Sequence, residues 1–154
     1  MSKKCLGVIF LLLVVIVGGV YKFLFQGSVS ASGDGRLAIH LSAGERDLVL
    51  GEMRSFLASI QQITRGIVED NMSLVVESAR TSGAAAQEAV PGTLIGKLPM
   101  EFKKLGFDTH SKFDRLALDT QDLEDGSHAL SQLSTLMQNC VACHAAYRID
   151  VADE

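Results

Sequence analysis

Two cysteines and a histidine lie together near the C-terminus with a spacing that suits cofactor or metal chemistry. The segment reads Cys140-Val141-Ala142-Cys143-His144, and a CxxCH pattern is the attachment signature of a c-type haem. Residues three apart share one face of a helix, so the two thiols can meet the two vinyl groups along one porphyrin edge. The histidine then stands where its imidazole can bind the iron from the proximal side. We therefore expect one covalently attached haem c.

The same residues are open to two other interpretations. A structural zinc site needs four ligands, but the only other cysteine is Cys5 and the nearest upstream histidine is His128. A thioredoxin-like CxxC pair belongs to a βαβ context, and no convincing strand pattern precedes the motif. Zinc binding and redox exchange remain alternatives, and covalent haem is favoured over both.

The first 26 residues are typical of a membrane segment. Residues 6–20 are an unbroken run of apolar residues and glycine, and with the aromatic residues that follow the stretch reaches about 20 residues, enough to cross a bilayer. Lys3 and Lys4 precede the run and the first acidic residue is Asp34, so the positive-inside rule places the N-terminus in the cytoplasm. We predict a transmembrane anchor at 1–26 in a bacterial inner membrane, with the haem domain in the periplasm, where bacteria attach haem c.

A cleaved secretory signal is the alternative. Val29-Ser30-Ala31 resembles the small-residue site that a signal peptidase accepts, and cleavage there would release a soluble periplasmic protein. The apolar run is longer than most signal-peptide cores, so the uncleaved anchor is favoured.

The remaining chain divides into a flexible linker at 27–41, rich in glycine and serine, and a folded domain at 42–154. Removing residues 1–31 takes away three lysines and no acid, so 14 basic and 18 acidic residues become 11 and 18, a formal charge of −7. This acidic balance argues against nucleic acid as a partner. A basic patch on another redox protein suits it better.

Four amphipathic segments predict an all-α fold, an antiparallel four-helix bundle. Ser42 and Glu45 form a capping box before the first helix, which ends near Glu69. Asn71 caps a second helix that stops at Gly83. A long connection follows, then a third helix from Pro99, and a fourth that is capped at residue 125 or 127 and carries the haem motif.

These features together resemble the class II c-type cytochromes, the cytochrome c′ family. The resemblance runs from about Ser42 to Ile149 and rests on CVACH in the fourth helix, on Tyr147-Arg148 after it and on the helical pattern around Met53. Most class I cytochromes c carry the motif near the start of the chain. In the family a basic residue commonly stands four after the haem histidine, and Arg148 fills that place. It would contact the proximal side of the haem or cap a helix end.

The resemblance also selects a residue for the distal side of the haem. In the family the first helix supplies it, followed by core residues at +3, +7, +10 and +14, and counting from Met53 gives Phe56, Ile60, Ile63 and Ile67. A shift of one turn would select Val49 or Leu57 instead. A Met53 thioether opposite His144 would give six-coordinate iron suited to carrying single electrons between a donor and an acceptor protein, without enzymatic activity.

If Met53 only packs over the haem, the resemblance implies five-coordinate iron that binds NO or CO. It also leaves homodimer formation open. Among the other histidines, we expect His40 to be exposed and His128, twelve residues before Cys140 and about 18 Å along a helix, to be too far away to bind the iron. His110 is expected at the surface or beside a haem propionate.

Overall fold

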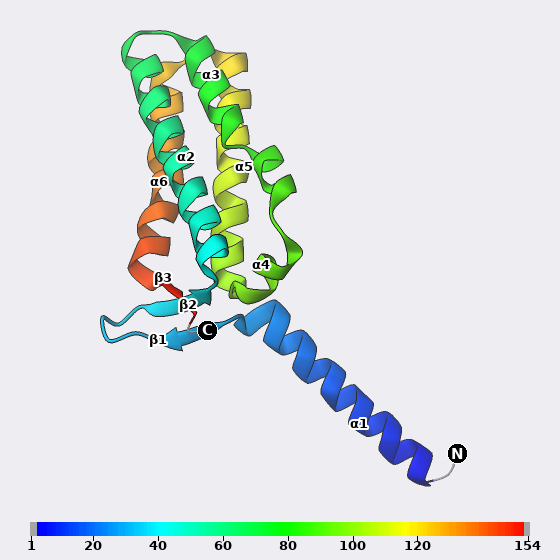
Figure 1. The fold of residues 1–154 in the computed structure, drawn as a ribbon. Coiled ribbons are helices and arrows are strands. Elements are labelled where there is room, and N and C mark those ends of the chain that lie inside the picture. The colour runs from blue at the N-terminus through cyan, green and yellow to red at the C-terminus, as the bar shows by residue number, and fades with distance from the viewer. Residues whose placement is uncertain (1–2, 153–154) are drawn as a thin grey trace.

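The computed structural model describes residues 3–152 and is mostly helical (Figure 1). This confirms the all-α expectation at the level of fold class. Four helices run alongside one another, and they alternate in direction along the chain: α2 (Ala43–Val68), α3 (Met72–Thr81), α5 (Met100–Leu123) and α6 (Gly126–Ala146). Each packs against its neighbours, α2 against α3 and α6, and α5 against α3 and α6.

Local capping signals set the starts of these helices. The Ser42 hydroxyl accepts a hydrogen bond from the Glu45 amide while the Glu45 carboxylate accepts one from the Ser42 amide, so the expected capping box is present. The Asn71 side chain accepts from the Leu74 amide at 3.0 Å at the start of α3. Asp125 caps α6 in the same way.

The main hydrophobic core lies between the four helices. Each helix contributes buried apolar side chains from one face, as the sequence periodicity predicts. The most completely buried are Ile63 from α2, Val75 and Ala79 from α3, Phe113 and Leu116 from α5, and Ala129 and Leu136 from α6.

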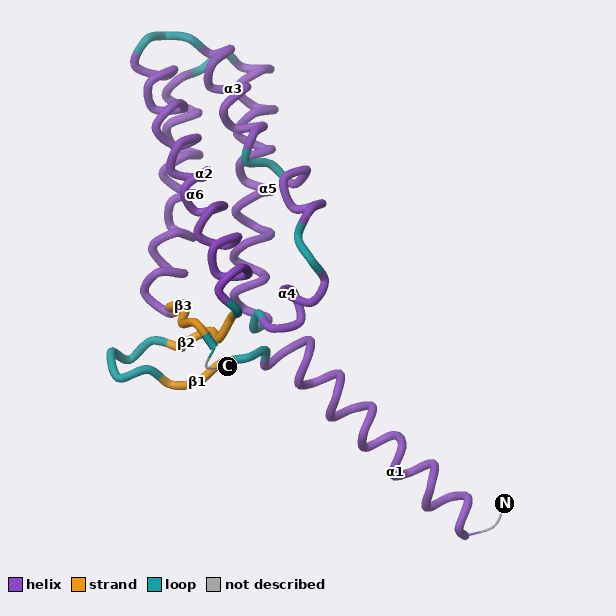
Figure 2. Tube along the Cα trace, viewed as in Figure 1, coloured by secondary structure: helices purple, strands orange, loops and turns teal. Residues whose placement is uncertain are grey.

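A small sheet closes one end of the helices, where no strand was expected (Figure 2). Strands β1 (Val29–Ala31) and β2 (Leu37–Leu41) pair antiparallel, and β2 pairs in parallel with β3 (Tyr147–Val151). The prediction of a flexible linker at 27–41 is therefore wrong. Ile39 and Leu41 are fully buried in a second core cluster, and the strand that orders β2 comes from the far end of the chain.

The long connection between the second and third helices contains the 3₁₀ helix η2 (Ala84–Ala89) and helix α4 (Gly92–Lys97). Leu94 and Leu98 anchor this segment in the second core cluster. The connection returns the chain from the middle of the four helices to the end at which the sheet lies (Figure 1).

At the N-terminus α1 (Lys3–Val20) continues into a π-helical segment, η1 (Tyr21–Gln26). Within the span Lys4–Gln26, an 18-residue window has a mean hydropathy of 2.6, and none of that window is buried in the protein. It is long and apolar enough to cross a membrane, a property that a signal sequence shares. Cys5 is exposed on this helix.

Candidate functional site

Helix α6 turns both cysteines of the CxxCH motif toward the interior. Ala129, Leu133 and Leu136 bury the inner face of α6, and Cys140 continues that face by packing against the main core. Cys143 packs against the second core cluster, while Val141 between them points outward and is largely exposed. The helical spacing predicted from the motif is thus present, and the thiols form no disulfide.

A cavity of about 350 Å³ lies in front of the motif, between α2, α5 and α6. The structure brings four of the predicted site residues to this one cavity: Met53, Cys140, Cys143 and His144. Most of the remaining lining is apolar, and it comes from Phe56, Leu57 and Ile60 of α2, Phe102 and Leu105 of α5, and Met137 of α6. Cofactor pockets of roughly 300–1,000 Å³ with such walls are typical of proteins.

These residues fit a covalently held haem. Cys140 and Cys143 would form the thioethers, His144 would bind the iron, and Met53 offers a thioether from a different helix. Gly106 of α5 also lines the cavity, and a Cβ at that position would meet nothing within 4 Å. The wall therefore leaves room beside the motif for a flat apolar group.

Both thiols are half-buried, and their surroundings disfavour the reactive thiolate. Burial raises the pKa of Cys140, and burial together with the charge of Cys140 raises the pKa of Cys143 to about 11. Reactive CxxC pairs have thiol pKa values below the usual range, so the environment disfavours a redox pair. Among residues 3–152, no three His, Cys, Asp or Glu side chains gather in a metal-binding group.

The register chosen for the first helix agrees with the lining of the cavity. Met53 is partly buried and contacts both core clusters. Val49, one turn earlier, is buried in the second cluster and lies outside the cavity. Leu57, one turn later, reaches the rim of the cavity but is 67% exposed. Of the three candidates, Met53 and Leu57 line the cavity, and Met53 is the more buried of the two.

Asn139 is a residue of this site that the sequence reasoning missed. It is buried on α6, and its amide nitrogen donates to Asp108 at 2.7 Å and to Thr109 at 3.2 Å. These bonds tie α6 to α5 directly beside the first cysteine. The sequence could have indicated this role, because Asn139 stands three residues after Leu136 and so lies on the same inner face of α6.

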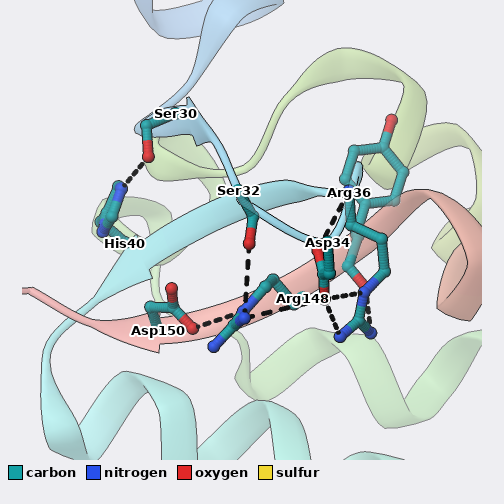
Figure 3. A network of polar contacts seen from close by, with 8 residues as sticks. Ser30, Ser32, Asp34, Arg36, His40, Arg148 and Asp150 are labelled. Atoms are coloured by element: carbon teal, nitrogen blue, oxygen red, sulfur yellow. Dashed lines mark hydrogen bonds and ion pairs between the residues drawn. The ribbon is translucent and has the colours of Figure 1, made fainter.

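Arg148 does not lie one helical turn beyond His144, because α6 ends at Ala146 and Arg148 belongs to β3. Its guanidinium donates to Asp150 at 2.9 Å and to Ser32 at 3.3 Å, and it lies 3.7 Å from Asp34 (Figure 3). The expected helix-capping role is therefore wrong, and Arg148 ties β3 to the turn between β1 and β2. It still lines a smaller cavity of about 190 Å³ beside His144 and Met53.

His110 is buried, contrary to the expectation of a surface or propionate-contacting residue. It is 2% exposed and lies outside the main cavity. Its Nδ1 is 2.9 Å from the Ser82 carbonyl oxygen, and its Nε2 is 3.2 Å from Oε1 of Glu52. Both neighbours are hydrogen-bond acceptors, an arrangement that favours the doubly protonated, positively charged imidazole. This ion pair joins α5 to α2 next to Met53.

The other two histidines also lie outside the cavity. His40, expected to be exposed, is partly buried on β2, with Nε2 2.7 Å from the Ser30 hydroxyl. His128 lies at the start of α6, 3.6 Å from Asp119, at the opposite end of the helix from the motif.

Replacing His110 with glutamine is expected to give a pH-dependent loss of stability. Burial alone lowers the pKa of His110, but its bonds to Glu52 and to the Ser82 carbonyl outweigh burial and the pKa is raised. Because the pKa is higher in the folded protein than in the unfolded chain, protonated His110 stabilises the fold. This stabilisation is fully present below the pKa of histidine in the unfolded chain, about 6.5, and is lost as the pH rises through the pKa of His110 in the folded protein.

The free energy of unfolding of the wild type should therefore exceed that of His110→Gln by about 1–3 kcal/mol in mildly acidic solution. This difference in stability should become smaller toward alkaline pH. Urea denaturation over a pH series measures it. The His128→Gln variant is the control, because His128 is only partly buried. A gap that stays constant with pH would mean that His110 is buried as the neutral imidazole.

No protein-family model, curated protein or solved structure matches this chain. Its function is therefore inferred from the motif and from the residues that surround it.

Proposed function

We propose that this chain is a membrane-anchored, periplasm-facing monohaem c-type cytochrome that carries single electrons between redox partners. The observation that supports it best is the meeting of Cys140, Cys143, His144 and Met53 at one apolar cavity. In this proposal α2, α3, α5 and α6 are the antiparallel four-helix bundle of a class II, cytochrome c′-like protein. The haem would supply the one-electron chemistry by cycling between ferric and ferrous iron.

The protein's own residues would hold the haem and set its potential. The two cysteines would fix one edge of the macrocycle, and His144 would bind the iron on the proximal side. Met53 would bind on the distal side and raise the potential. The apolar walls contributed by Phe56, Phe102 and their neighbours would exclude water from the iron, which also affects the potential.

The redox partners would be proteins, and the charge of the domain bears on their recognition. The chain beyond residue 31 has a formal charge of −7, so a partner with a basic patch would be attracted over long range at low ionic strength.

Binding of NO or CO is the second candidate function. It is supported by the packing of Met53 against both hydrophobic clusters, because a methionine that fills a core position need not bind iron. The iron would then be five-coordinate and keep an open site for a diatomic gas.

Haem staining after denaturing electrophoresis tests the proposal. The full chain, produced in cells that mature c-type cytochromes, should keep a stained band, and the Cys140→Ala/Cys143→Ala variant should lose it. A wild-type band without stain would refute covalent haem. The ferrous spectrum with CO then separates the two candidate functions, since immediate carbonyl formation would favour the gas-binding protein over the methionine-ligated carrier.

A further inference from the structure

The apolar N-terminal helix does not end in a free tether but is joined to the start of α5 by a buried lysine. Lys103 is 8% exposed, and its Nζ lies 3.1 Å from the Leu24 carbonyl oxygen and 3.3 Å from that of Phe23. The last carbonyl groups of a helix lack intrahelical donors and attract positive charge. The Lys103 ammonium supplies those donors, so the end of the anchor is bonded to the domain.

The next residues close the joint between anchor and domain. Gly27 has φ +68, and a Cβ there would lie 2.7 Å from the backbone of Leu98 and of Pro99. Only glycine accepts both this conformation and this close approach. Ser28 then donates its amide hydrogen to Lys97 at 2.7 Å, and its carbonyl accepts from His40 at 2.8 Å. We call residues 21–28 the collar.

The collar lies where the membrane surface would be. Tyr21 and Lys22 stand at the domain end of the apolar span, and such residues mark the interface between bilayer and water. One turn after Lys103, on the same face of α5, Phe107 is 50% exposed. Phe107 therefore offers an exposed apolar side chain one turn beyond the lysine that bonds the end of the anchor.

This face adjoins the face of α5 that lines the haem cavity. Phe102 and Gly106 line the haem cavity, and together with Lys103 and Phe107 they also line a second cavity against α4. Lys103 and Phe107 do not line the haem cavity.

We propose that the face of α5 that carries Lys103 and Phe107 rests on the lipid surface of the membrane in which α1 is anchored. The collar fixes the domain in this orientation, with the haem cavity on the neighbouring face of α5. The inference rests on the uncleaved anchor of the proposed function but not on the haem.

Photocrosslinking to lipid tests this orientation. A benzophenone amino acid replaces Phe107 or, as the matched control, Leu118, in the full chain reconstituted into phosphatidylethanolamine–phosphatidylglycerol vesicles. Leu118 is 56% exposed and lies on nearly the same face, about 16 Å further along α5. After irradiation, intact mass should show a phospholipid adduct at 107 and none at 118. Equal adducts at both positions, or none at 107, would overturn the proposal.

The role of the collar is tested in the same experiment. Lys103→Met should abolish the adduct at 107, and Lys104→Met, which removes an exposed lysine paired with Glu101, should leave it. An adduct that survives Lys103→Met would show that this lysine is not needed to keep α5 against the membrane. The same mass spectra also show whether haem is covalently attached and whether the N-terminal anchor has been cleaved. A chain that begins at Ser32 would overturn the membrane orientation, and a mass without haem would overturn only the proposed redox function.

Discussion

Met53→Ala is expected to lower the midpoint potential of the haem by at least about 59 mV, a tenfold change for a one-electron couple. Methionine opposite histidine raises the potential of a c-type haem, and alanine at this position removes the thioether from the cavity. The reduced spectrum should change from six-coordinate low-spin to five-coordinate high-spin at the same time. Potentiometric titration followed by absorption measures both.

Leu57→Ala is the matched control for this substitution. Leu57 lies one turn further along α2 and reaches the same cavity from its rim, so truncating it changes the apolar lining without removing a ligand. The midpoint potential of the Leu57→Ala variant should stay close to that of the wild type. If Met53→Ala leaves potential and spectrum unchanged, Met53 is core packing and the distal assignment fails.

The largest loss of stability is expected when the haem can no longer be held, in the variant Cys140→Ala/Cys143→Ala/His144→Ala. The apolar walls of this open cavity of about 350 Å³ would then face water, and each 100 Å² of apolar surface left exposed costs about 2.5 kcal/mol. Total stabilities are about 5–15 kcal/mol. We expect partial collapse of the helices and a loss of several kcal/mol, measured by urea denaturation with circular dichroism.

Binding of a hydrophobic dye should increase in the same variant, because α2, α5 and α6 lose the group between them. Cys5→Ala is the control, since Cys5 is exposed on α1 and does not line the cavity. A triple variant as stable as wild type would indicate that nothing fills this cavity in the native protein.

Features that depend only on residues close together in the chain could be predicted from the sequence. A helix cap needs only a few consecutive positions, so the capping box at Ser42 and the caps at Asn71 and Asp125 could be read from the chain. The inward direction of Cys140 and Cys143 follows from helical spacing in the same way.

Features that depend on contacts between segments far apart in the chain could not be predicted from the sequence. β2 is ordered by β3 and by the second core cluster, and its short sequence lies next to glycine and serine. The burial of His110 depends on Glu52 from another helix and on the Ser82 carbonyl. Arg148 leaves the helical register because α6 gives way to a strand. In each case a contact between remote segments decides the environment.

The parallel pairing of β2 with β3 also affects how the protein is made. Leu37 pairs with Tyr147, 110 positions later, so β3 can pair with β2 only after the chain has been synthesised through Val151. The CxxCH segment directly precedes β3. Its thiols are therefore synthesised before the strand that completes the sheet.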